Sequence, residues 1–129
     1  MMNKRLSILI ILYEENFEVI KKCLSKIDEY KIIIIDNAND QSLKDKIIKN
    51  FKIYKYFLNK KNIGFSKAAN QGISECDTEY LLILGADCLI TYSDIEQLII
   101  AKEKYKDCFL TSPTIYDHTG KLTYNGGPL

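Results

Sequence analysis

Stretches of β-branched and other apolar residues alternate along this chain with stretches of helical periodicity. The apolar runs predict strands at residues 6–12, 31–35, 53–58, 80–84 and 108–111. Between these runs, apolar positions recur every three or four residues, which predicts helices that each bury one face. This alternation indicates an α/β domain in which helices cover both faces of a mostly parallel sheet.

The expected helices differ in what they present to the sheet. The first one places these apolar side chains on one face: Phe17, Ile20, Cys23, Leu24 and Ile27. The second follows a polar loop at residues 36–40 that can cap it. The third, residues 65–73, carries alanine and glycine on its apolar stripe, so we expect it to approach the sheet closely. The fourth spans residues 93–106, with Thr91 or Ser93 as its cap, and residues 114–116 and 121–124 predict a C-terminal β-hairpin.

Length and charge narrow the classes of protein. A chain of 129 residues has the size of one domain but is short for an enzyme with two substrates, so we expect a single, incomplete domain. Eighteen basic and seventeen acidic side chains leave a net charge of +1, which argues against nucleic acid as a partner. We interpret the lysines between positions 44 and 55 as a solvated face.

Neither a membrane span nor a zinc site is expected. The apolar run that follows Lys4 and Arg5 is interrupted by Glu14 and Glu15, far short of the roughly 20 residues that cross a bilayer. The four cysteines form no Cys-x-x-Cys pair, and His118 is the only histidine. We therefore expect reduced, structural thiols.

Acidic residues follow three of the expected strands. Glu14 and Glu15 come after the first, Asp36 after the second and Asp87 after the fourth. In open parallel sheets ligands bind at the carboxyl ends of the strands, so these side chains should converge. One such carboxylate is usually a helix cap or a solvated turn, but three at one edge indicate a site. Because glutamates repel bare phosphate, a phosphate ligand there needs a cation, and Asp87 is the candidate ligand for Mg²⁺ or Mn²⁺.

Four segments, at residues 10–16, 34–42, 59–73 and 82–87, resemble successive signatures of family 2 glycosyltransferases, in order and at suitable spacing. The third is the most specific and is similar to the pattern Asn-x-Gly-Phe-x-x-Ala-x-Asn-x-Gly of the family, in its rhamnosyltransferase-like branch. Residues 112–127 resemble the following proline, hairpin and Gly-Gly segment more loosely. The resemblance implies a GT-A-type, Rossmann-like fold and the nucleotide-sugar-binding half of such an enzyme.

The resemblance also implies roles for individual residues. Asp36 accepts the imide N–H of a uracil or thymine ring, and Asp87, the last acid of the Asp-x-Asp motif of the family, binds the metal. Gly85 stands at the first position of that motif, which removes one side-chain ligand. The other implied contacts to the donor come from Tyr13, Glu14, Asn37, Asn62, Gly64, Lys67 and Asn70.

The activity implied is an inverting, metal-dependent transfer from a UDP- or dTDP-sugar to a glycan or lipid-linked glycan in bacterial cell-surface polysaccharide synthesis. We expect a cytoplasmic protein that reaches the inner membrane face through partners. The family takes its catalytic base from a later acceptor-binding half, and we expect residues 1–129 to stop before it. None of the acids after Asp87 is expected to lie where it could act as that base. These acids are Asp94, Glu96, Glu103, Asp107 and Asp117.

Two other readings stay open. A non-catalytic nucleotide-binding module would keep the pocket without an acceptor half, and Gly85 favours it. A phosphoacceptor receiver domain also has alternating strands and helices in about this length, but it needs an aspartate at the end of the third strand. Residues 56–60 offer no acid there, which argues against the receiver.

Overall fold

The computed structural model describes residues 4–125, and its internal contacts define two compact units that divide between Ile90 and Thr91. Unit 1 contains a four-stranded sheet with three helices, and unit 2 contains one helix and a two-stranded hairpin. The α/β class and the mostly parallel sheet are thereby confirmed. None of the helices in residues 4–125 is long and apolar enough to cross a membrane.

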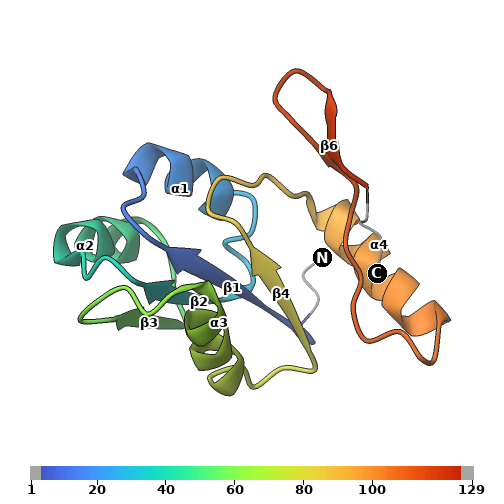
Figure 1. Ribbon diagram of the computed structural model, residues 1–129, viewed down its shortest axis with the longest axis horizontal. Coiled ribbons are helices and arrows are strands. Elements are labelled where there is room, and N and C mark those ends of the chain that lie inside the picture. Colours follow the sequence, from blue (N-terminus) through green and yellow to red (C-terminus); the bar gives the residue numbers. More distant parts are fainter. Residues whose placement is uncertain (1–3, 126–129) are drawn as a thin grey trace. The chain divides into compact units, whose positions relative to one another are not determined.

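The sheet of unit 1 is entirely parallel, in the order β3-β2-β1-β4 (Figure 1). The two central strands are almost completely buried, which explains their continuous apolar sequences. The outer strands are only partly buried. The bounds are β1 (Leu6–Leu12), β2 (Lys31–Asp36), β3 (Lys55–Leu58) and β4 (Tyr80–Leu84).

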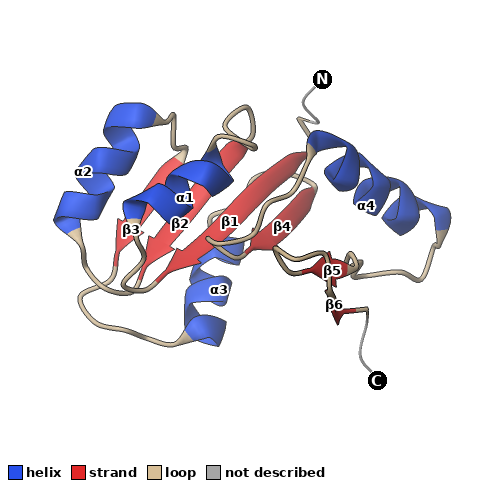
Figure 2. Cartoon of the chain, turned by 90° about the horizontal axis from the view of Figure 1, so that it is seen from above, coloured by secondary structure: helices blue, strands red, loops and turns tan. Residues whose placement is uncertain are grey.

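The helices cover both faces of the sheet. Figure 2 shows α1 and α2 together on one face and α3 on the other. Two of the three helices, α1 and α2, begin with a side-chain N-cap. Asn16 Oδ1 accepts from the Glu18 N–H at 2.8 Å, and Asp40 Oδ1 accepts from the Leu43 N–H at 2.9 Å. The bounds are α1 (Phe17–Leu24), α2 (Gln41–Asn50) and α3 (Phe65–Ser74). The first helix is shorter than predicted and gives way to turns before Ile27.

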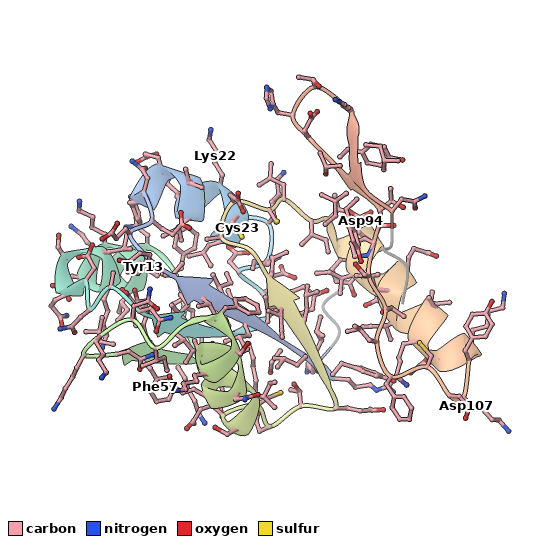
Figure 3. All side chains as sticks on the ribbon, viewed as in Figure 1. Tyr13, Lys22, Cys23, Phe57, Asp94 and Asp107 are labelled. Carbon is pink, nitrogen blue, oxygen red and sulfur yellow. The ribbon has the colours of Figure 1, made fainter. Side chains whose placement is uncertain are left out.

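Side-chain alternation assigns each strand residue to one face. Leu9, Ile33 and Ile35 form a buried cluster with Ala68 of α3, and Phe57 of β3 packs against it (Figure 3). Their neighbours Ile32 and Ile34 therefore point toward the α1 and α2 layer. The same alternation decides where the polar residues at the end of β2 point. Asp36, two residues after Ile34, faces the α1 and α2 layer, and Asn37, two residues after Ile35, faces α3.

The close packing of α3 depends on Gly72, and we expect Gly72→Ala to destabilise unit 1. A Cβ at this position would overlap both methyl groups of Leu9, which is fully buried on β1. Overpacking of this kind costs about 1–3 kcal/mol. Urea denaturation of Gly72→Ala, of Leu9→Val and of the double variant measures the loss in free energy of unfolding. The shorter valine should recover part of the loss, and additive losses would contradict the proposed clash.

Unit 2 confirms the helix and the hairpin. Helix α4 (Tyr92–Lys104) begins with a capping box in which Thr91 and Asp94 bond each other's backbone N–H. The strands β5 (Ile115–Tyr116) and β6 (Leu122–Tyr124) pair antiparallel. Between the helix and the hairpin the chain forms turns and irregular structure.

The fifth strand predicted at residues 108–111 is wrong. Cys108 closes a turn by donating its N–H to Tyr105 O at 3.1 Å, and Phe109 and Leu110 are 94% and 86% exposed. Within residues 91–125 the only strand pairing is between β5 and β6. A short apolar run becomes a strand only where another strand pairs with it, and the run itself does not reveal whether such a partner exists.

Candidate functional site

The strand register brings the sequence-predicted carboxylates of unit 1 to one edge of the sheet. Leu12 is paired with Asp36, and Asp36 is paired in turn with Leu58 of β3. On the other side of β1, Ile10 is paired with Leu84, so β4 ends close to the level of its neighbours. The residues that follow β1, β2 and β4 therefore share one edge, as predicted.

Asp36 is fully buried and its carboxylate is already hydrogen-bonded. Its Oδ1 accepts from the Ala38 N–H at 2.8 Å, and its Oδ2 accepts from the Tyr56 hydroxyl at 3.1 Å. Burial, and next the negative charge of Asp36, raise the pKa of Tyr56 far above its ordinary value, so the phenol stays protonated and keeps donating. A carboxylate can accept about four hydrogen bonds, so Asp36 retains acceptor capacity.

Tyr56 is a residue that sequence reasoning missed. It faces the same side of the sheet as Asp36 because it pairs with Ile34, two residues earlier on β2. The Lys44 ammonium lies 5.4 Å from the centroid of its ring. The available signal was a tyrosine two positions before the end of an edge strand. It indicates a partner for Asp36 only once the register between β2 and β3 is known.

Tyr13 and Glu14 follow β1 and both are exposed (Figure 3). Glu14 has a φ of 54°, in the left-handed region that residues other than glycine seldom adopt. Such backbone conformations are unfavourable and are enriched at ligand sites. The structure thus has a strained turn where the resemblance implies contacts to the donor.

Asn37 lies on the other face of the sheet end and takes part in an amide network. Its Oδ1 accepts from Asn59 Nδ2 at 2.9 Å, and its own Nδ2 donates to Gly64 O at 3.4 Å. Asn59 Nδ2 also donates to Gln71 Oε1 at 3.0 Å. Asn37 is only 4% exposed, so its side chain contacts protein rather than solvent. Asn59 and Gln71 were not among the predicted site residues.

The loop after β3 carries the remaining predicted donor contacts to the same edge. Asn62 is exposed, and its Oδ1 accepts from the Gly64 N–H at 2.8 Å. Gly64 is the N-cap residue of α3 with a φ of 82°, a conformation that favours glycine. Lys67 and Asn70 follow on α3, three residues apart on one side of the helix, and both are exposed.

Asp87 is exposed just beyond β4, and two thiols lie around the same turn. Cys23 Sγ of α1 is 3.9 Å from Gly85 O, and Cys88 Sγ is 3.8 Å from Asp87 Oδ1 (Figure 3). Burial, followed by the nearby Cys88 and Asp87, raises the pKa of Cys23 to about 11. Burial and Asp87 also raise the pKa of Cys88. Both sulfurs are therefore protonated at neutral pH and are poor ligands for a hard cation.

Because position 85 is glycine, Asp87 is the only carboxylate in the turn at residues 85–87. A Cβ at position 85 would lie 3.1 Å from Asp87 Oδ1, so the absence of a side chain lets the carboxylate fold over the turn. No group of three or more His, Cys, Asp or Glu side chains within residues 4–125 could hold a metal ion. The residues present therefore fit Mg²⁺ or Mn²⁺ only as an ion with one protein carboxylate and with diphosphate and water as the other ligands.

Two of the acids after Asp87 are engaged in turns of unit 2. Asp94 Oδ2 accepts from the hydroxyl and the N–H of Thr91. Asp117 Oδ1 accepts from the Thr119 hydroxyl at 2.6 Å and from the N–H groups of Thr119 and Lys121 at 2.8 and 3.0 Å. These hydrogen bonds lower the pKa of both carboxyls. A carboxylate stabilised in its ionised form is a weak general base.

A cavity of about 480 Å³ lies at the opposite, amino-terminal edge of the sheet. It is lined by Lys4, Leu6, Asp28, Glu29, Tyr30, Lys31, Lys52 and Tyr54. Its Lys31 is held by Asp77, with both N–O distances at or below 3.0 Å. Ligands of open parallel sheets bind at the carboxyl edge, so that edge and not this cavity is the candidate site.

Comparison with known proteins gives the same fold. The crystal structure of S. aureus TarS superposes with a TM-score of 0.58 at 20% sequence identity, over 76% of this chain and 20% of that one. The crystal structure of S. aureus TarS 1-349 gives the same TM-score and identity, and 33% of that chain is covered. This chain thus spans a third or less of either structure. No curated protein matches its sequence.

A family model does match the sequence itself. The model described as glycosyl transferase family 2 covers residues 7–126. That range includes both the carboxyl edge of the sheet and the hairpin. The chain therefore belongs to glycosyl transferase family 2.

Proposed function

We propose that this chain binds the donor of an inverting sugar transfer, a UDP- or dTDP-sugar, at the carboxyl edge of the sheet. The observation that carries the proposal is the convergence of Asp36, the strained turn at Glu14 and Asp87 at one edge of a family 2 domain. Each of the three contributes a different contact, to the base, the ribose and the diphosphate.

Asp36 supplies the base contact in this proposal. Uracil and thymine present an N–H between two carbonyls, and an ionised carboxylate is an acceptor-only group. The Tyr56 and Ala38 donors fix the carboxylate, and because Asp36 is fully buried, the ring N–H reaches the remaining lone pairs only when the polar loop after β2 opens. Tyr13, half exposed at the same edge of the sheet, offers a face on which the ring can stack.

Asp87 supplies the metal contact, and Mg²⁺ or Mn²⁺ would neutralise the departing nucleoside diphosphate. Glu14 and Glu15 at the same edge repel the diphosphate, so its binding there without a cation is unfavourable. Asn62, Gly64, Lys67 and Asn70 would border the sugar diphosphate from the α3 side. Lys67 is the one positive charge among them.

The complete reaction also needs an acceptor and a base. We propose a glycan or lipid-linked glycan acceptor, used in cell-surface polysaccharide synthesis on the cytoplasmic side of the membrane. In this proposal the base comes from an acceptor-binding half outside the described residues, and the engagement of Asp94 and Asp117 in turns supports it. A non-catalytic nucleotide-binding module is the second candidate, and Gly85 in place of a second acid is the observation that favours it.

Calorimetric titration tests the proposal. UDP or dTDP should bind, and more tightly with Mn²⁺ or Mg²⁺ than with chelator. ADP should bind at least about tenfold more weakly, because adenine has no imide N–H for Asp36. The absence of heat with UDP and dTDP in the presence of metal would refute donor binding. Equal affinity for ADP would refute the role of Asp36.

A further inference from the structure

The amide network at the ends of β2 and β3 has one member that bonds two of the others. Asn59 Nδ2 donates to both Asn37 Oδ1 and Gln71 Oε1, at 2.9 and 3.0 Å. An amide nitrogen carries two hydrogens, so both are used. The backbone of Asn59 is held as well, because its N–H donates to Asp36 O at 2.9 Å. Asn59 thus joins β2, β3 and α3.

The direction of these hydrogen bonds fixes the orientation of Asn37. Because Asn37 presents its oxygen to Asn59, its nitrogen is directed at the carbonyl of Gly64. Gly64 is also held from the other side, where its N–H donates to Asn62 Oδ1. The turn at residues 62–64, which starts α3, is therefore held on both sides, and its outer side is exposed.

We infer that Asn59 is a positioning residue for the donor, which preorganises the turn at residues 62–64 through Asn37 without touching the ligand. This inference rests on the proposed function, because the turn is a proposed donor contact. A rigid turn binds more tightly than one that must be ordered on binding. Gln71 fixes the other hydrogen of Asn59 and so supports the same orientation from α3.

The substitution Asn59→Asp tests the direction of the network with almost no change in shape. An aspartate only accepts, so Asn37 and Gln71 must both turn their nitrogens toward it. Asn37 then presents its oxygen to Gly64 O, and the hydrogen bond that holds the turn is replaced by repulsion. Asn50→Asp is the matched control, because Asn50 donates to Lys46 O on the exposed side of α2.

Two readouts on the full chain are needed, the Kd for UDP with Mg²⁺ and the amide hydrogen exchange of residues 62–65. Asn59→Asp should weaken UDP binding by about tenfold, the cost of ordering a loosened loop, and should speed exchange at Gly64. Asn50→Asp should match the wild type in both. Wild-type affinity and exchange in Asn59→Asp would overturn the inference.

Gln71→Met removes a single hydrogen bond and keeps the helix, so it tests the inference even if Asn59→Asp fails to fold. It should weaken UDP by about threefold, in keeping with one neutral hydrogen bond. A Gln71→Met variant with wild-type affinity and exchange would overturn the inference. If the wild type itself does not bind UDP, the proposed function fails, a result distinct from a wild type that binds and variants that do not differ from it.

Discussion

Residues 1–129 alone should not transfer sugar to an acceptor at an enzymatic rate, although they should hold a donor. General-base assistance contributes about 10² to 10⁴ in rate, and positioning of the acceptor contributes more. Two acids of unit 2 are engaged in local structure, because Asp94 caps α4 and Asp117 closes the hairpin turn. Both carboxyls have a lowered pKa, the opposite of what a base needs.

The assay combines the purified chain with UDP- and dTDP-sugars, Mn²⁺ and a panel of glycan acceptors, and quantifies product by mass spectrometry. Hydrolysis of the donor, measured in parallel, shows whether the donor is bound but attacked by water. Where the reading frame continues beyond residue 129, the longer protein is the comparison. Turnover near the ordinary enzymatic range, about 1–10³ per second, by the 129 residues would show that they contain the base.

Base recognition and metal binding should be separable by substitution at Asp36 and Asp87. Asp36→Asn keeps the shape of a fully buried side chain but replaces one accepting oxygen by N–H₂, which then opposes either the ring N–H or one of the present donors. It should weaken uridine, which has no phosphate, by roughly 1–3 kcal/mol, or about 5- to 150-fold. Asp87→Ala should leave uridine unchanged and abolish only the metal-dependent gain for UDP.

Tyr56→Phe controls for the loss of structure around Asp36. It removes the 3.1 Å hydrogen bond to Oδ2 but leaves the carboxylate that the base would use. Uridine affinity within about threefold of the wild type is the expected result, since the lost hydrogen bond is made to Asp36 and not to the base. If Tyr56→Phe loses as much uridine affinity as Asp36→Asn, the loss in Asp36→Asn comes from disturbed structure and not from a missing contact to the base. Titration calorimetry with folding checked by circular dichroism decides.

The elements of unit 1 could be predicted from sequence because their signals are local. Four apolar runs, the capping loop that contains Asp40, and the small residues of α3 each depend on a few neighbouring positions. The rule that ligands gather at carboxyl ends of parallel strands then predicted the edge where Asp36 and Asp87 lie. The roles of the predicted donor and metal contacts stay predictions.

What could not be predicted depends on pairing between distant residues. Tyr56 meets Asp36 only because β3 pairs with β2 in a particular register, and Asn59 meets Gln71 only because α3 packs on the sheet next to the loop that follows β3. The run at residues 108–111 has strand propensity, yet strand formation depends on a partner that its own sequence does not specify. Hydrophobic periodicity describes one element at a time and carries no information about such pairs.

The most direct test of the carboxyl-edge site is NMR mapping of the nucleotide on the isotopically labelled chain. With UDP and Mg²⁺, amide shifts should change at Glu14, Asp36 and Gly64, and replacement of Mg²⁺ by Mn²⁺ should broaden resonances around Asp87. Lys4 and Lys52, at the large cavity of the opposite edge, should stay unchanged. Shift changes and broadening confined to that cavity would contradict the account.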